Sequence, residues 1–596
     1  MMEEIIKWNL GDFYEGINDP KIEKDIRDLE ELAGQFNQKV KGRLSDPLLT
    51  SNQLLKWYEE YEKITERTYY LGIYANLIYS INRLDDDVKS FNSKIDEFKA
   101  RIQEKLLFFD LELNNISNEK YEELIKAPEL KRYSHSLKFN RLKKQHQLSE
   151  KEEQIILMKQ ITGAKAFVKL YDELKSSFVF DFEVDGETRN ITEAELFGYM
   201  FHSDKDIRHK ALSTMMKEYD KNAMIFSHAF NNVLKDWDLE SKKKNFSKPI
   251  SRRNLENEVS DESVDVLGEV TTDSYAIVEK YYNIKKKILD LPELHMSDLY
   301  APVGEVSIKY SYEEAIELIK KVVEMFHPEF KSIVQKMYEL KHIDVTPRKG
   351  KNRGAFCEYG KLKHYPFVFV NYVDTVDSLR ALAHELGHAF HAYYIQRDQN
   401  FLNLEVSLVA AEIASIFNEI LVFDYLMNTE LSMEEKIAML CSFIESKFST
   451  SHRQNAFYRF EKYMHDLMES KLPSAEEIKG AFAKEMQLMF GNSMVNIKEE
   501  YSNYIFVVSH FLHVPFYVYA YNMSNLLVIA LYQLYLEQKN EFIPKFIKLL
   551  SLGSSRSPEE MLSDIGINLN DPSFWQKGIK YLSDKIGELE KLVENK

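Results

Sequence analysis

The chain has 596 residues, enough for more than one domain, and its low content of Gly (20) and Pro (14) favours a mainly helical protein. A net charge of −17 argues against nucleic acid as a partner. The two cysteines, Cys357 and Cys441, are too few for a disulfide framework and fit a reducing compartment.

The first residues lack a basic region followed by an apolar core, so we expect no signal peptide. The apolar stretch 526–535 is too short to span a bilayer. We therefore expect a cytoplasmic protein that does not act at a membrane.

Residues 1 to about 180 show helical periodicity with charged faces. Helices are predicted over 20–41, 51–83 and 86–114. The stretch 178–187 alternates apolar and acidic residues and reaches Asp-Gly, which predicts a short hairpin. Here we place a domain boundary, between a helical N-terminal domain over 1–190 and a second domain over 191–596.

A small sheet is predicted after a helical stretch over 312–340. Three β-like segments are joined by Gly- and Lys-rich turns, at 343–345, 354–359 and 367–372. An edge strand of such a sheet can pair with an extended peptide. The alternative is a sheet with no role in substrate binding.

The run 381–391 reads Ala-Leu-Ala-His-Glu-Leu-Gly-His-Ala-Phe-His and is composed largely of helix formers. On a helix, His384 and His388 stand on one face and can bind one metal ion. Glu385 projects beside them, where it can act as a general base. This HExxH pattern indicates two zinc ligands and a base. The alternative is a surface helix with two solvated histidines.

A catalytic zinc needs a third protein ligand. The pattern HExxHxxGxxH would require Gly at 391 and His at 394, but the sequence has His391 and Tyr394. Another solution is a Glu on a second helix. The apolar, Ala-rich stretch 406–419 predicts a buried helix with Glu412 in its middle, where a carboxylate is costly unless it is paired or bound to metal. The predicted ligands of one zinc ion per chain are His384, His388 and Glu412.

Two neighbouring residues have more than one interpretation. Glu419 lies two turns beyond Glu412, and it either accepts a hydrogen bond from a ligand histidine or forms a salt-bridged face. Gly387 costs about 1 kcal/mol in a helix relative to Ala. Either its missing side chain lets a strand or substrate approach closely, or the helix tolerates it.

These motifs resemble the oligoendopeptidase F family of thimet-oligopeptidase-like zinc peptidases. The resemblance implies a large, two-lobed helical peptidase that encloses a deep cleft, with the N-terminal domain as one wall and a small sheet beside the zinc helix. It implies zinc-dependent endohydrolysis of short peptides in the cytoplasm, with Gly354 and Ala355 on the substrate-binding edge strand. The matching blocks are 348–357, 366–371, 384–391, 412–415 and 515–521.

Histidines and tyrosines are dense in the stretch 509–521. A Tyr hydroxyl or an imidazole N–H can stabilise the negative charge that builds on a carbonyl oxygen during amide hydrolysis. By the resemblance, His510 followed by Tyr517 fits this role. Core packing is the alternative for any single tyrosine. Competing candidates for contact with the substrate are His513, Tyr519 and Tyr521.

Two other functions remain open from the sequence. One is an exo-acting relative, such as a dipeptidyl carboxypeptidase or carboxypeptidase, which needs a group to hold the terminal carboxylate. The other is a non-catalytic peptide-binding module on a peptidase scaffold. The sequence does not indicate an oligomeric state.

Overall fold

The computed structural model describes residues 5–184, 186–304, 308–360, 362 and 364–595. The chain divides into two compact units, each assembled from three segments. The first comprises Met1–Gln145, Ile308–Leu426 and Leu534–Gly566, and the second comprises His146–Ser307, Met427–Gln533 and Ile567–Lys596. Because both units draw on distant segments, the single boundary near residue 190 stays a prediction.

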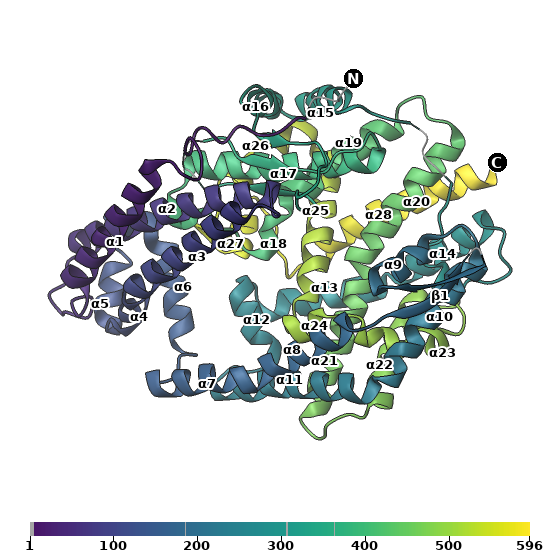
Figure 1. Ribbon diagram of the computed structural model, residues 1–596, viewed down its shortest axis with the longest axis horizontal. Helices are drawn as coiled ribbons and strands as arrows, with labels where there is room; N and C mark the ends of the chain where they lie inside the picture. The colour runs from purple at the N-terminus through teal and green to yellow at the C-terminus, as the bar shows by residue number, and fades with distance from the viewer. Residues whose placement is uncertain (1–4, 185, 305–307, 361, 363, 596) are drawn as a thin grey trace. The chain divides into compact units, whose positions relative to one another are not determined.

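The first unit consists of helices and one small sheet (Figure 1). Its α-helices are α1 (Pro20–Val40), α2 (Ser51–Ile81), α3 (Asp86–Leu106), α4 (Phe108–Asn115), α5 (Asn118–Leu124), α6 (Ser134–Lys144), α15 (Tyr312–Phe326), α16 (Pro328–Glu339), α17 (Val376–Asp398), α18 (Leu408–Ala411), α19 (Ile413–Met427), α26 (Ile543–Leu550) and α27 (Pro558–Ser563). Its strands are β3 (Ile343–Asp344), β4 (Phe356–Glu358) and β5 (Phe367–Phe369). Short 3-10 helices lie at Pro128–Tyr133, Phe401–Asn403 and Lys539–Glu541.

The second unit is helical apart from one hairpin. Its α-helices are α7 (Glu150–Thr162), α8 (Ala164–Ser176), α9 (Glu193–Gly198), α10 (Lys205–Lys221), α11 (Ala223–Lys243), α12 (Pro249–Asn257), α13 (Asp261–Asp273), α14 (Ala276–Ile288), α20 (Met433–Thr450), α21 (His452–Met468), α22 (Ala475–Phe490), α23 (Ile497–Tyr501), α24 (His510–His513), α25 (Val518–Gln538) and α28 (Pro572–Glu594). The hairpin is formed by β1 (Phe180–Val184) and β2 (Glu187–Ile191), and 3-10 turns lie at Tyr199–Phe201, Met296–Asp298 and Ser502–Phe506.

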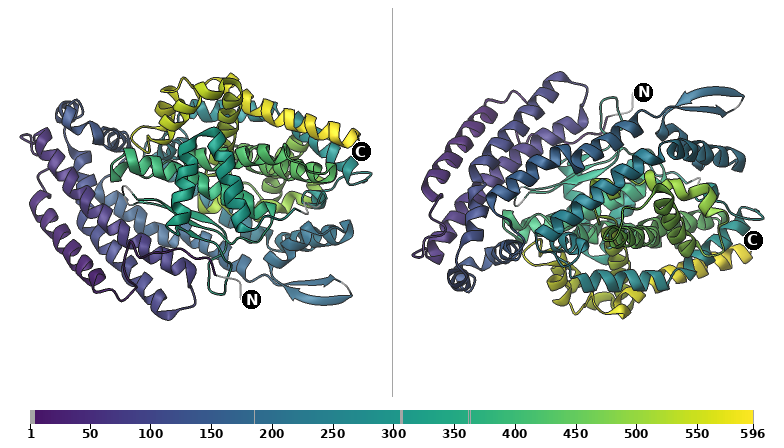
Figure 2. Two further views of the ribbon diagram at one scale, coloured as in Figure 1. Left: turned by 90° about the horizontal axis from the view of Figure 1, so that it is seen from above. Right: turned by 90° about the horizontal axis from the view of Figure 1, so that it is seen from below.

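The N-terminal helices form where the sequence supplies helix starts and one apolar face. Asp19 accepts a hydrogen bond from the Lys21 N–H at the start of α1. Leu29 and Phe36 are buried where α1, α2 and α3 lie side by side, as all three views show (Figures 1 and 2). The predicted hairpin is confirmed, with β1 antiparallel to β2, and Thr192 caps the helix that follows it.

The predicted three-stranded sheet is confirmed, with β5 in the centre. The strand β3 is parallel to β5, with Ile343 opposite Val368, whereas β4 is antiparallel to β5, with Phe356 opposite Phe369. The short strands and the many helices confirm a mainly α fold with a small sheet beside α17. The cleft that the resemblance implies stays a prediction.

The stretch predicted as one helix over 86–114 divides at Leu107 into α3 and α4, and two further predicted helices are interrupted. The stretch 312–340 breaks at His327, which is extended at φ −151° and ψ 123°, because the next residue is Pro328. The stretch 406–419 begins its helix only at Leu408 and breaks at Glu412, whose backbone at φ −90° and ψ 3° leaves the helical region. The second break places the Glu412 carboxyl at a turn and not on a continuous helix.

Among the residues that the structure describes, no single helix is long and apolar enough to cross a membrane. The bent pair Ile497–His513 and Val518–Glu541 meets the length and composition requirement together, with an angle of 86° between its halves. Most of α25 is buried in the protein, which explains its apolar composition.

Candidate metal centre and active site

The helix α17 presents a buried apolar side and a half-buried polar side. Thr375 caps it by accepting a hydrogen bond from the Ser378 N–H. Leu382 and Leu386 are fully buried, whereas the side chains of His384 and His388 keep 29% and 22% of their exposure. Packing of the apolar side therefore fixes the direction in which both imidazoles point.

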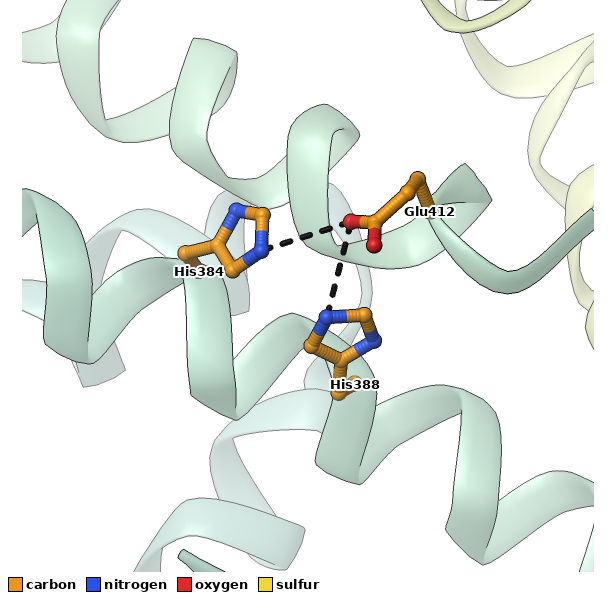
Figure 3. A group of neighbouring side chains, drawn as sticks. All are labelled: His384, His388 and Glu412. Carbon is orange, nitrogen blue, oxygen red and sulfur yellow. Dashed lines mark ion pairs between the residues drawn. The ribbon is translucent and has the colours of Figure 1, made fainter. Parts of the chain in front are cut away.

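The turn between α18 and α19 brings Glu412 to these imidazoles, and Figure 3 shows the three side chains converging. Glu412 Oε2 lies 3.3 Å from His384 Nε2 and 3.5 Å from His388 Nε2. Ligand atoms at 2.0–2.2 Å from a tetrahedral zinc lie roughly 3.4 Å from one another. The spacing and chemistry of the three predicted ligands therefore fit a zinc ion.

Gly387 lies where α17 meets α19. A Cβ at this residue would lie 2.5 Å from both Ala414 O and Ser415 Cα. In addition, Asn418 Nδ2 donates a hydrogen bond to Ala383 O at 2.6 Å. The close approach at Gly387 is thus made by the backbone that follows Glu412, and neither a strand nor a substrate is needed to explain the glycine.

Charge and burial keep two of the predicted ligands in the form that binds a metal at neutral pH, with Glu412 ionised and His388 neutral. Burial would raise the pKa of Glu412, but His384, His388 and the Ser415 hydroxyl together lower it to about 2. Ser415 Oγ donates to Glu412 Oε2 at 2.6 Å. Burial lowers the pKa of His388 to about 4, so its imidazole is neutral.

Glu419 lies on the far side of the His384 ring. Its Oε2 is 3.8 Å from His384 Nδ1, and its Oε1 accepts a hydrogen bond from Arg380 Nη2 at 2.7 Å. Burial would lower the pKa of His384, but Glu412 and Glu419 together raise it to about 10. Glu419 is salt-bridged to Arg380, and its role as an acceptor for His384 stays a prediction.

Glu385 is only 7% exposed, and its Oε2 has no hydrogen-bond partner among the described residues. Burial raises its pKa to about 7, with the Glu412 charge adding to the rise against the effect of His384. A carboxyl with such a pKa can accept and release a proton near neutral pH.

A cavity of about 390 Å³ joins the three predicted ligands, Glu385 and the strand β4. Ala355, Phe356 and Cys357 line one part of it. Gly354 precedes them in a left-handed conformation at φ +82°. Gly354 and Ala355 stay predicted substrate contacts, and β4 offers a sheet edge inside the cavity.

The opposite edge of the sheet is covered by the N-terminal segment. Asn9 N–H donates to Lys341 O at 2.7 Å, and Val345 N–H donates to Ile6 O at 3.1 Å beside β3. Of the two sheet edges, β4 is therefore the one that faces the cavity.

His391 and Cys357 also line the cavity, and neither received a role from the sequence. His391 is buried, and its pKa is lowered to about 3 by burial, so it is neutral. The helical spacing could have placed His391 at this cavity, because His391 follows His384 by seven residues and shares its helix face.

The His/Tyr block belongs to the second unit, where His510, Tyr517 and Tyr521 form a cluster. Tyr521 Oη lies 3.4 Å from His510 Nε2, and the rings of His510 and Tyr517 are parallel, with centroids 6.0 Å apart. All three side chains are partly exposed. They are thus available for contact with a substrate.

The other two candidates of this block lie differently. Tyr519 is 1% exposed, and its hydroxyl accepts a hydrogen bond from Asn257 Nδ2 at 2.8 Å, so it is a packing residue. His513 is exposed and lies 2.9 Å from Asp172 Oδ1. Their predicted substrate contacts have less support than those of Tyr517 and Tyr521.

Comparisons with known proteins agree along most of the chain. A model of peptidase family M3 matches residues 198–581, and a model of oligopeptidase F matches residues 112–180. Oligopeptidase PepF of Bacillus subtilis (strain 168) is 25% identical, over 98% of this chain and 87% of its own length. The oligoendopeptidase F homolog of Lactococcus lactis subsp. lactis (strain IL1403) is 23% identical, over 99% of this chain and 98% of its own length.

A solved structure has the same fold. The crystal structure of oligoendopeptidase-F from Enterococcus faecium aligns with a TM-score of 0.71 over 97% of this chain and 99% of that chain. The two sequences are 21% identical.

Proposed function

The chain belongs to peptidase family M3 and is a metallopeptidase, and from this membership we propose that it is a zinc endopeptidase that cleaves internal bonds of short peptides. The observation that carries the proposal is the convergence of His384, His388 and Glu412 in one cavity with the buried base Glu385. The relatives named above, an oligopeptidase and oligoendopeptidases, support the choice of oligopeptide substrates.

His384, His388 and Glu412 would hold one zinc ion per chain. Zinc bound there supplies a Lewis acid that polarises the scissile carbonyl and lowers the pKa of a water molecule. Glu419 would orient His384 through Nδ1, which leaves Nε2 directed at the ion.

Glu385 would move the proton during hydrolysis. Its carboxylate accepts a proton from the attacking water and then gives it to the nitrogen of the leaving amine. The raised pKa of about 7 supports this double role, because the group must change its protonation state twice in each cycle.

The edge strand β4 would hold the substrate by main-chain hydrogen bonds, with Gly354 and Ala355 at its start. His510 and Tyr517 would donate hydrogen bonds to the oxygen that becomes negative as the carbonyl is attacked. Burial lowers the pKa of His510 and so favours its neutral form. A neutral imidazole still donates one N–H.

We also infer a cytoplasmic location, a role without nucleic acid or membrane, and short peptides as the partners. Cys357 and Cys441 are both free thiols in the structure, which supports a reducing compartment.

An internally quenched peptide blocked at both termini tests the function, alongside zinc analysis of the purified protein. We expect about one zinc per chain and cleavage at an internal bond. Cleavage restricted to a version with a free C-terminus would instead support an exopeptidase. Bound zinc without cleavage of either peptide would support a peptide-binding module.

A further inference from the structure

The turn between α24 and α25 contains a bulky residue in a left-handed conformation. Tyr517 N–H donates to Val514 O at 3.1 Å and closes a four-residue turn. Pro515 is its second residue, and the third, Phe516, has φ +56°. Pro at the second position and a positive φ at the third are the features of a type II turn, whose third residue is usually Gly. Phe516 is therefore strained, and the surroundings must hold it.

Type I and type II turns differ by a flip of their central peptide. Here that peptide joins Pro515 to Phe516. A flip to the type I form would return Phe516 to the negative φ that an L-residue prefers. The flip leaves the Cα atoms of the turn nearly in place, so it changes which groups the Pro515 carbonyl and the Phe516 N–H can reach and not the course of the chain.

Two ionisable side chains hold this peptide from opposite ends. Arg253 Nε donates to Pro515 O at 3.0 Å, and Phe516 N–H donates to Glu461 Oε1 at 2.7 Å. A flip would turn the carbonyl toward the Glu461 carboxyl and the N–H toward the Arg253 guanidinium, which would break both hydrogen bonds. The Phe516 ring also stacks on His465, with centroids 4.4 Å apart.

Glu461 lies deep in the second unit. Its exposure is 0%, and its Oε2 has no hydrogen-bond partner among the described residues. Burial raises its pKa to about 8, against the effects of the Phe516 N–H and of Arg253. At neutral pH the carboxyl is largely protonated, so Gln is a close mimic, and either group can accept the Phe516 N–H through its carbonyl oxygen.

The anchored turn connects His510 to the tyrosines of α25. His510 precedes the turn, Tyr517 is its fourth residue, and Tyr521 follows it on α25. The ring centroids of the two tyrosines are 5.0 Å apart. We propose that Glu461 and Arg253 are positioning residues, which hold the Pro515–Phe516 peptide and thereby place Tyr517 against His510 for catalysis. The inference rests on the proposed function, since it assumes that Tyr517 serves peptide hydrolysis.

Glu461→Leu removes the acceptor at nearly constant volume, and Glu461→Gln keeps it. We expect Glu461→Leu to lower kcat by up to about 100-fold, the loss that a misplacement of about 1 Å can cause. KM and zinc content should change little, and Glu461→Gln should retain most of the activity. Arg253→Met removes the other hydrogen bond and should also lower kcat. Equal kcat values for Glu461→Leu, Arg253→Met and the unchanged enzyme would overturn the proposal.

A second background distinguishes positioning from general damage. Gly adopts a positive φ without strain, so in a Phe516→Gly chain the turn no longer needs Glu461. The further loss of kcat on adding Glu461→Leu should therefore be less than about 3-fold, because the two substitutions act on the same turn. An equal loss in both backgrounds would contradict action through the Phe516 conformation.

Hydrogen exchange of the segment 510–521 tests the inference without any turnover. We expect faster exchange in Glu461→Leu than in Glu461→Gln, because the Phe516 N–H loses its acceptor. Unchanged exchange in Glu461→Leu would overturn the proposal even if the protein cleaved no peptide. If the unsubstituted protein does not cleave the blocked peptide, but Glu461→Leu still exchanges faster than Glu461→Gln, the proposed function is refuted and the anchoring of the turn is kept.

Discussion

At the scale of single residues, Glu385 combines deep burial with an oxygen that no described residue satisfies. Buried carboxyl oxygens normally have hydrogen-bond partners, because an unpaired one is costly. Glu385 keeps Oε2 unpaired beside a cavity that also holds the predicted metal ligands. The cost is explained if water or substrate supplies the missing partner during the reaction.

Glu385→Gln should keep the metal and lose most turnover, because an amide cannot accept the proton. We expect kcat to fall by roughly 10²–10⁴, the usual contribution of a general base. Hydrolysis of the blocked peptide and zinc analysis measure the two quantities. Glu405→Gln, at an exposed carboxyl of the same unit, is the control and should leave kcat unchanged. Wild-type turnover in Glu385→Gln would show that another group is the base.

Glu419→Gln should weaken metal binding by about 10- to 100-fold, the usual effect of losing an outer partner of a ligand histidine. The substitution removes the negative charge that lies 3.8 Å from His384 Nδ1. Competition with a zinc chelator measures the affinity. Asp377→Asn is a matched control, because the exposed Asp377 also pairs with Arg380 but is not paired with His384. Equal affinities in the two variants would leave Glu419 with a salt-bridging role alone.

At the scale of elements, the metal centre depends on the contact between α17 and α19. The first helix carries both histidines, and the turn before the second carries Glu412. Their backbones approach so closely at Gly387 that no Cβ fits between them. The glycine therefore serves the convergence of the ligands, although Gly is a poor residue inside a helix.

Gly387→Ala should destabilise the protein and weaken metal binding, even though Ala is the better helix former. The added Cβ would push against backbone atoms at 2.5 Å, and such overpacking costs about 1–3 kcal/mol. Gly34→Ala in α1 is the control, because its Cβ would meet nothing within 4 Å. That change should stabilise the fold by about 0.5–1 kcal/mol. Thermal unfolding and chelator competition measure both variants, and an unchanged Gly387→Ala would contradict the close contact.

At the scale of the whole molecule, metal removal should abolish hydrolysis and leave the helices intact. The predicted ligands are half-buried, whereas the apolar side of α17 is packed in the core without them. Far-UV circular dichroism should therefore be the same before and after treatment with chelator, and added zinc should restore activity. Loss of helical signal on chelation would mean that the metal is needed for folding.

Much of the fold follows from local patterns in the sequence. The Asp19-Pro20 helix start, the hairpin before Thr192 and the small sheet before α17 were predicted and are present. Capping residues, Asp-Gly turns and apolar periodicity act over a few residues, so they can be recognised without the rest of the chain. The break at Glu412 was not predicted, because the surrounding stretch contains no Gly or Pro.

The sequence by itself determined the mainly helical class, the predicted ligands and the predicted base, because HExxH spacing on a helix places two imidazoles on one face. Only the tertiary structure decided that the approach at Gly387 is made by α19, that Tyr519 packs in the core and that Glu461 accepts a hydrogen bond from Phe516 N–H. These facts depend on which distant segments of the chain meet. Helical or strand periodicity indicates which side of an element is buried, but it does not indicate which segment packs against that side.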